Sequence, residues 1–385
     1  MSSSDKSSLL FSPLKIRGIT LRNRICVAPM AQCSAVDGVP NDWHLVHYGS
    51  FAKGGAGLVM VEATIVEARG RVSRGCTGLW DDHQIEPWRR ITTFLRAQGS
   101  VPGIQLAHGG RKASGQPFWV GHGSVADEDG GWPTIGASAV PFGGAVWKVP
   151  KEATIDDIDE LEEAFVSGAK RAVEAGFEVL ELHFAHGWLV SSFLSPLTNH
   201  RTDKYGGCLE NRMRFGLEIA AKVRNSIPED IVIGVRISVT DYADNGWDIK
   251  QSIDFAKKLK TIGMDFIDCS SGGVVSYIDY NGLNANGVQL KAAQSIQKEV
   301  GIATAAVGKI VDPHEAEAIL RGNGATLIFI GRAFLNNPHW PYMAADVLAN
   351  KMSFKYPDQY DWCIGWRGFD KWRRDVLKDE NNNLF

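Results

Sequence analysis

The sequence predicts a single (β/α)8 barrel, the TIM-barrel fold, with a long insertion after the third strand. Eight short apolar or β-branched runs recur along the chain, and amphipathic segments ending in glycine lie between several of the later ones. A length of 385 residues suits one large barrel or two medium domains. The eight predicted strands are 24–30, 57–63, 103–107, 177–183, 231–237, 265–270, 302–307 and 326–330.

The segments between the strands have the spacing of amphipathic helices. In 154–176 the residues at helical spacing are apolar, Thr154 can cap the start, and Gly176 can end the helix. Segments 251–263 and 313–324 repeat the arrangement. Alternating strands and helices favour a parallel sheet, because each parallel connection needs a crossover. An open doubly wound sheet is the competing fold, and the lack of a GxGxxG motif after the first strand weakens it.

The longest interruption is the segment 109–150, which is rich in Gly, Trp and Pro. In a barrel it leaves the end of the third strand, so we expect a lid or a substrate rim there and not a separate domain. The whole chain, 1–385, is then one domain, with 351–385 as a C-terminal tail.

Composition excludes several classes of protein. A formal charge of −3, from 41 basic and 44 acidic residues, and a single short basic cluster at 371–374 argue against nucleic-acid binding. No window approaches the roughly 18 apolar residues that a membrane helix needs. The six cysteines form no CxxC pair, and the N-terminus lacks the apolar core of a signal peptide. We therefore expect a cytoplasmic protein that does not enter a membrane.

Two histidines three residues apart, His183 and His186, stand at the end of the fourth predicted strand. Within a strand they would point to opposite faces, but a turn that begins near His183 brings both imidazoles to one side. Their N–H groups could then converge on one oxygen, such as that of an enone or a nitro group. A zinc site and a purely structural pair are the alternatives. No third ligand stands at a recognisable spacing and HExxH is absent, so no metal is predicted.

Short glycine turns follow the last two predicted strands, "VGKI" at 307–310 and "IGRAF" at 330–334. Barrels often bind a phosphate at this position, with Arg332 as a charged partner, although plain strand-to-helix turns would look the same. Gln105 and Arg236 stand near the ends of two other strands. A flavin ring could accept hydrogen bonds from both, and a structural ion pair is an equally good explanation for the arginine.

Long motifs of the chain resemble the old yellow enzyme family of FMN-dependent ene-reductases, in particular its thermophilic-like and xenobiotic-reductase-like members. They are "LFSPLKIRGITLRNRICVAPM", "IQLAHGGRKA", "HFAHGWLVSSFLSPLTNHRTDKYGG", "ENRMRF" and "LIFIGRAFLNNP", and together they span nearly the whole chain. The string "FLSPLTNHRTDKYGG" after HxxH is the most specific of them.

The resemblance implies a set of functional residues. His183 and His186 would bind the oxygen of the substrate, and Lys112 would lie near the flavin or the pocket rim. The residues expected around FMN are Pro29, Met30, Ala31, Ala63, Gln105, Arg236, Gly308, Gly331 and Arg332. NADPH or NADH would reduce the flavin, a small activated alkene would take the hydride, and a homodimer or homotetramer is expected.

Three positions depart from the family pattern. Ala31 and Cys33 stand where relatives read "PMCxY", and Trp188 stands where a tyrosine protonates the substrate. An indole N–H is too weak an acid for that step. We therefore expect water or another residue to deliver the proton, with Trp188 as a wall that stacks on a flat substrate.

The C-terminal segment "YDWCIGWRGFDKWRR" carries further aromatic residues. In relatives a C-terminal residue closes an active site, often that of a neighbouring subunit, so Trp362 or Trp366 is a candidate for the substrate pocket here. A surface helix with buried aromatic residues is the simpler alternative.

Three functions are consistent with these residues. The first is an NAD(P)H-dependent reductase of enones and related electron-poor alkenes. The second is a flavin-dependent desaturase or isomerase of a biosynthetic intermediate, suggested by the missing acid. The third is a flavin-binding protein with little turnover, against which the intact histidine pair argues.

Overall fold

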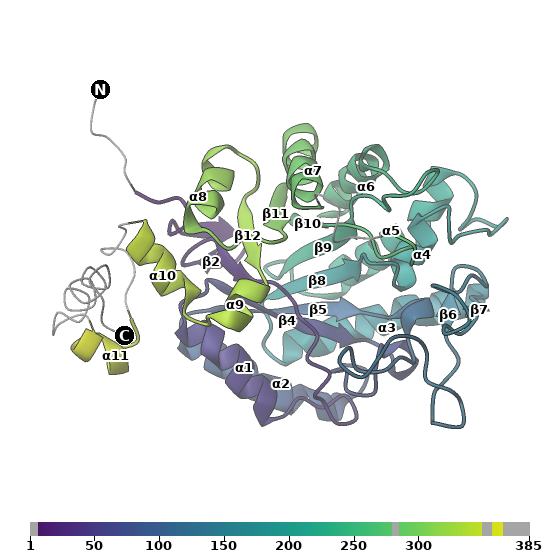
Figure 1. Cartoon of the computed structure of the whole chain (residues 1–385), viewed down its shortest axis with the longest axis horizontal. Helices are drawn as coiled ribbons and strands as arrows, with labels where there is room; N and C mark the ends of the chain where they lie inside the picture. The colour runs from purple at the N-terminus through teal and green to yellow at the C-terminus, as the bar shows by residue number, and fades with distance from the viewer. Residues whose placement is uncertain (1–6, 279–284, 349–355, 365–385) are drawn as a thin grey trace, which may run out of the picture.

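Eight parallel strands close into a barrel in the computed structural model of the chain, which describes residues 7–278, 285–348 and 356–364 (Figure 1). Around the barrel the strands follow chain order. They are β3 (Ile25–Val27), β4 (Leu58–Ile65), β5 (Val101–Ala107), β8 (Val179–Phe184), β9 (Val232–Ser238), β10 (Phe266–Ser270), β11 (Ala303–Val307) and β12 (Leu327–Ile330).

Pairing of the last strand with the first closes the sheet, with Ile328 opposite Ile25. This closure confirms the predicted (β/α)8 barrel and all eight predicted strands, and it excludes the doubly wound sheet, which would leave two edge strands.

Helices surround the barrel on its outer face (Figure 1). The described helices are α1 (Asp42–Lys53), α2 (Ile85–Ala97), α3 (Ile155–Glu174), α4 (Leu189–Leu194), α5 (Leu209–Ser226), α6 (Ile249–Ile262), α7 (Ala285–Val300), α8 (Pro313–Arg321), α9 (Arg332–Asn336), α10 (Trp340–Val347) and α11 (Asp358–Ile364). Short 3-10 turns occur at Ala68–Gly70, Asp82–Gln84 and Gly110–Lys112.

Local sequence signals place the ends of α3 where we predicted them. Thr154 caps its N-terminus in a capping box with Asp157, and Gly176 follows its C-terminus with a φ of +86°. The other two predicted helices, α6 and α8, begin at the aspartate caps Asp248 and Asp312.

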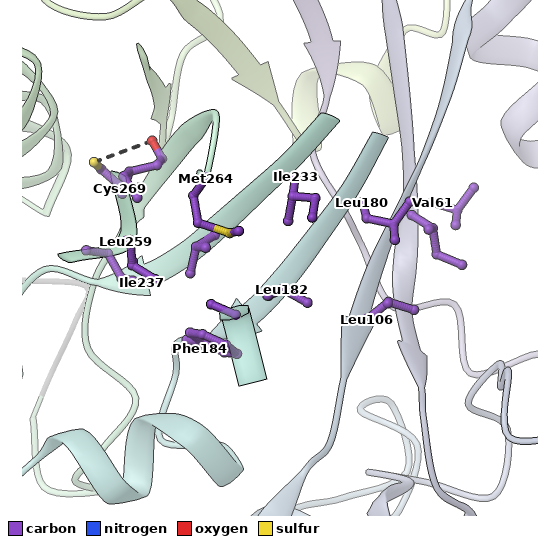
Figure 2. Packing of buried hydrophobic residues seen from close by; sticks show 14 of the residues in the cluster. Val61, Leu106, Leu180, Leu182, Phe184, Ile233, Ile237, Leu259, Met264 and Cys269 are labelled. Carbon is purple, nitrogen blue, oxygen red and sulfur yellow. Dashed lines mark hydrogen bonds between the residues drawn. The ribbon is translucent and has the colours of Figure 1, made fainter. Parts of the chain in front are cut away.

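The larger apolar core fills the space between the strands and the surrounding helices. Figure 2 shows part of it, where side chains from neighbouring strands such as Leu106, Leu180 and Ile233 form one continuous layer. These side chains are fully buried. At about 25 cal/mol per Å2 of buried apolar surface, this layer supplies much of the free energy that holds the barrel together.

A second apolar cluster fills the barrel at the beginning of its strands. It contains Leu58, Val179, Val232 and Phe266, and the hairpin of β1 (Leu14–Ile16) and β2 (Ile19–Leu21) packs Ile19 and Leu21 against it. The polar residues gather at the opposite end, where the strands leave the barrel.

The insertion 109–150 carries little regular structure beyond β6 (Ile135–Gly136), which pairs with β7 (Lys151–Glu152). Cation–π contacts fix it to the loop after β4, because the Arg71 guanidinium lies 5.0 Å from the Trp132 ring and 5.6 Å from the Trp80 ring. Figure 1 shows this segment on the side of the barrel away from α10 and α11. Among the described residues no helix is long and apolar enough to cross a membrane.

Close packing inside the barrel gives a test of the fold. A Cβ atom on Gly234 of β9 would lie 2.1 Å from the Phe266 ring, so Gly234→Ala should lower the free energy of unfolding by about 1 to 3 kcal/mol. Urea denaturation measures the change. Gly144→Ala is the matched control, because nothing lies within 4 Å of its Cβ, and equal stability of the two variants would contradict this packing.

Candidate active site

The register of β8, β9 and β10 sets three polar side chains at one level of the barrel. His183 of β8 is opposite Arg236 of β9, and Arg236 is opposite Asp268 of β10. One step back along the strands, Gln105 of β5 is opposite Glu181 of β8. Partners in a parallel sheet point to the same face, so these residues form a polar layer near the end of the barrel.

The two histidines meet because the chain leaves β8 in a tight turn. The strand ends at Phe184, and His186 and Gly187 adopt left-handed φ values of +63° and +70°. The turn brings His186 Nδ1 to 3.2 Å from His183 Nε2, with the ring centroids 4.9 Å apart. The predicted approach of the two imidazoles is confirmed.

Four contacts hold the His186 turn. The Ser270 hydroxyl lies 2.6 Å from His186 Nε2, and the His186 amide donates to the Ser238 hydroxyl. Lys112 Nζ donates to the carbonyl oxygens of His186 and Gly273, each at 2.9 Å. Lys112 therefore supports the histidine turn from the rim, and its ammonium lies 3.8 Å from the centre of the Phe142 ring in the insertion.

Both imidazoles are neutral at physiological pH. Burial lowers the pKa of His183 and of His186 well below the ordinary value, and the positive charges of Arg236 and Lys112 act in the same direction. Burial also lowers the pKa of Lys112 itself, to about 7. A neutral imidazole has one N–H donor and one acceptor nitrogen. The hydrogen-bond partner of one ring nitrogen determines which of the two carries the proton.

Arg236 takes part in a buried ion pair, which is one of the two arrangements expected for this residue. Its Nε lies 3.3 Å from Asp268 Oδ2, and the Asp268 side chain is completely buried. Burial raises the pKa of Asp268 and raises that of Glu181 well above its usual range, which favours the protonated form of Glu181. Gln105 Nε2 donates to Glu181 Oε1 at 2.6 Å and completes the network.

A cavity of about 490 Å3 opens beside this network. Six of the predicted cofactor residues line it together: Pro29, Met30, Arg236, Gly308, Gly331 and Arg332. Ala28, Lys309 and Phe329 also line it and were not predicted, although Lys309 lies within the quoted "VGKI" turn. Residues from four separate segments, 28–30, 236, 307–311 and 329–333, therefore meet around one space.

The lining of this cavity suits an anion joined to a flat polar group. In the turn after β11, Gly308 has a φ of +117° and Lys309 one of +49°, a conformation that can present backbone N–H groups to an anion. The side chains of Lys309 and Arg332 are exposed cations. Apart from the ion pair of its Nε with Asp268, Arg236 makes no side-chain contact of this kind within the described part of the chain, so its terminal N–H groups can donate to an acceptor in the cavity.

The other predicted cofactor residues lie around the cavity and not in its lining. Gln105 is bound to Glu181, and Ala63 belongs to an apolar cluster against which Trp188 packs. Ala31 directly follows the lining residue Met30. Trp188 lies against the histidines, with its ring centroid 4.5 Å from that of His183.

Of the two C-terminal candidates, Trp362 does not join this site within the chain. Trp362 lies on α11, half exposed, with its Nε1 donating to the Gln359 carbonyl. Figure 1 shows α11 beside α10, away from the insertion. Trp366 lies outside the described residues.

Sequence reasoning missed Ser270, Asp268 and Glu181, which position the predicted residues. The exit string "CSSGG" contains Ser270, but only the register shows that its hydroxyl reaches His186. No group of three or more His, Cys, Asp or Glu side chains that could hold a metal ion occurs in the parts of the chain described.

Comparisons with known proteins agree with this geometry. The model of the NADH:flavin oxidoreductase / NADH oxidase family matches residues 9–351. An NADPH dehydrogenase of Geobacillus sp. (strain WCH70) is 42% identical over 367 residues, covering 94% of this chain and 99% of the relative. An NADH:flavin oxidoreductase of Gibberella zeae is 41% identical over 377 residues, covering 94% of this chain and 91% of the relative.

Among solved structures, morphinone reductase superposes with a TM-score of 0.75 at 26% identity, covering 90% of this chain and 91% of that one. The chain therefore belongs to the NADH:flavin oxidoreductase / NADH oxidase family, the old yellow enzymes, and is an NAD(P)H-dependent flavin oxidoreductase with FMN as its cofactor.

Proposed function

We propose that this enzyme reduces the C=C bond of enones and related electron-poor alkenes. The observation that carries the proposal is the pair of neutral imidazoles whose His183 Nε2 and His186 Nδ1 atoms lie 3.2 Å apart beside the cofactor cavity. Two such donors can bind one carbonyl oxygen and stabilise the negative charge that develops on it when hydride adds to the β-carbon. Bound FMN supplies that hydride.

The hydrogen bonds around His186 determine how the pair works. Without substrate, one of these two nitrogens donates a hydrogen bond to the other. For both histidines to donate to one substrate oxygen instead, the protons must sit on His183 Nε2 and His186 Nδ1. His186 Nε2 is then an acceptor, so the Ser270 hydroxyl at 2.6 Å must donate to it. We assign Ser270 as the positioning residue that fixes this tautomer.

The cavity beside the histidines would hold FMN. We assign its phosphate to the turns at Gly308 and Gly331 with Arg332, and the pyrimidine edge of its ring to Arg236. Pro29, Met30 and Ala31 follow β3 at the same end of the barrel and would lie against the ring. The insertion 109–150 would form the rim of the substrate pocket, held to the histidine turn through Lys112 and Phe142.

Trp188 supports a second candidate, a flavin-dependent desaturase or isomerase of a specialised intermediate. The indole stands beside the histidine pair and cannot act as a general acid. A reaction that needs no protonation at the α-carbon would tolerate this residue.

An anaerobic spectroscopic experiment separates the candidates. NADPH or NADH should bleach the flavin absorbance, and 2-cyclohexenone should restore it under the proposed function. Bleaching without recovery favours the desaturase or isomerase, and no bleaching indicates a flavin-binding protein with little turnover.

His186→Ala should lower kcat/KM for enone reduction by roughly 10²- to 10³-fold, because one of the two donors to the developing charge is lost. Steady-state NADPH oxidation measures the effect in protein with full flavin absorbance. His314→Ala, at an exposed histidine on α8, is the matched control. A variant as active as the control would show that the pair does not bind the substrate.

Trp188→Tyr should raise the rate of enone reduction, since a phenol restores an acid beside His183. A positioned general acid contributes roughly 10² to 10⁴ in rate, so a gain of about tenfold is expected even with imperfect geometry. Trp188→Phe controls for the loss of the indole. If the tyrosine and phenylalanine variants turn over equally fast, the proton is already delivered by another route.

Arg332→Ala should raise the Kd for FMN by roughly 10- to 100-fold, the equivalent of a charge-assisted hydrogen bond of about 1.5 to 3 kcal/mol. Fluorescence titration of the apoprotein with FMN measures this affinity. Arg90→Ala, at an exposed arginine paired with Asp42 on α1, should leave it unchanged. Equal affinities would place the phosphate elsewhere.

A further inference from the structure

Two cysteines from different loops form a thiol pair at the wall of the site. Cys33 lies in the loop after β3 and Cys76 in the loop after β4, and the two thiols are close enough that each shifts the pKa of the other. Both are free thiols, 8% and 4% exposed. Cys76 belongs to the apolar cluster that includes Ala63 and against which Trp188 packs. The pair therefore adjoins the residues that departed from the family pattern.

The backbone holds the two loops together at this point. The Ala35 amide donates to the Gly75 carbonyl at 2.9 Å. A Cβ on Gly75 would lie 2.2 Å from the Cys33 carbonyl oxygen and 3.0 Å from its Cα. Only glycine allows such close approach, and it brings the residue preceding Cys76 into direct contact with Cys33. The sulfur atoms can thus meet without a large movement of the chain.

The surroundings make the two thiols chemically different. The Cys76 thiol and the Phe118 amide of the insertion lower the pKa of Cys33 to about 7, against the opposing effects of burial and of Glu62. The pKa of Cys76 is raised well above its ordinary value. At neutral pH Cys33 is therefore substantially the reactive thiolate, while Cys76 keeps its proton.

We propose that Cys33 and Cys76 are a peroxide-reactive pair that closes to a disulfide in the wall of the active site, with Cys33 as the attacking thiol and Cys76 as the resolving one. Nothing in this step depends on which substrate the flavin reduces.

The chemistry uses hydrogen peroxide as the oxidant. The Cys33 sulfur attacks one peroxide oxygen, an S–O bond forms, the O–O bond breaks, and the departing hydroxide takes a proton to become water. Cys76 then attacks the sulfur of the Cys33 sulfenic acid. An S–S bond forms, the S–O bond breaks, and the leaving hydroxide departs with the Cys76 proton as a second water. Two electrons pass from the thiols to the peroxide.

The experiment uses full-length holoenzyme carrying Cys208→Ser and Cys363→Ser, which removes the two exposed thiols. After brief treatment with hydrogen peroxide, the intact mass should fall by two hydrogens and a peptide should link Cys33 to Cys76. Dithiothreitol should reverse both changes. The buried Cys26 and Cys269 are internal controls and should stay reduced.

Single substitutions then separate the two roles. With Cys76→Ser, dimedone should trap a sulfenic acid at Cys33, at least about tenfold faster than at Cys26. With Cys33→Ser, Cys76 should give no comparable adduct. Flavin absorbance and circular dichroism verify that both variants are folded.

The linked peptide in the parent protein tests the proposal even if a variant fails to fold. The proposal is overturned if Cys33 and Cys76 remain reduced or if they oxidise no faster than Cys26. It is also overturned if the sulfenic acid appears first on Cys76.

Discussion

The buried ion pair between Arg236 and Asp268 is the interaction on which the rest of the site depends. An isolated charge inside a barrel is very costly, and a guanidinium 8% exposed is held there by a carboxylate that is completely buried. The register of β9 against β10 fixes this pair, because the two residues are direct partners in the sheet. Removing Asp268 would leave the arginine charge uncompensated in the barrel.

Arg236 faces Asp268 on one side and the cavity on the other. One edge of the guanidinium faces Asp268, and the residue also lines the cofactor cavity, where its remaining donors have no partner within the described segments. The raised pKa of Glu181, which Gln105 holds, disfavours a second negative charge beside Asp268. The N–H groups that Arg236 turns toward the cavity suit an electron-accepting ring whose reduced form is anionic.

Nearby positive charges also help to explain why the two histidines are suited to donate hydrogen bonds and not to act as acids. Arg236 and Lys112 both lower the pKa of His183 and His186, in addition to burial. An imidazolium would be repelled by two cations, whereas a neutral ring still offers one N–H to a substrate oxygen. The pair can thus bind and polarise a carbonyl without itself supplying the proton. With Trp188 in place of a tyrosine, the proton for the substrate must come from another group or from water.

The fold could be predicted from sequence because its signals are local. Each strand is a short apolar run, and helix ends such as Thr154 and Gly176 follow from capping chemistry. The histidine turn was also predictable. At three-residue spacing, His183 and His186 can reach the same side only if the strand ends near His183. Six of the residues expected around FMN followed from a resemblance, and they line one common cavity.

The residues that sequence reasoning missed are those whose role depends on register between distant strands. Ser270 is 84 positions from His186, and nothing near either residue signals their contact. The contact of Cys33 with Cys76 depends likewise on how two loops close over Gly75. Both thiols were visible in the sequence as scattered cysteines without a CxxC motif, a pattern that gave no sign of a pair.

The departures from the family pattern form one connected wall of the site. Trp188 packs on the cluster that holds Cys76, and Cys76 in turn contacts Cys33, which stands where relatives carry a tyrosine. Because residues packed around one cluster share neighbours, substitutions at Trp188 and at Cys33 should have coupled and not additive effects on the site.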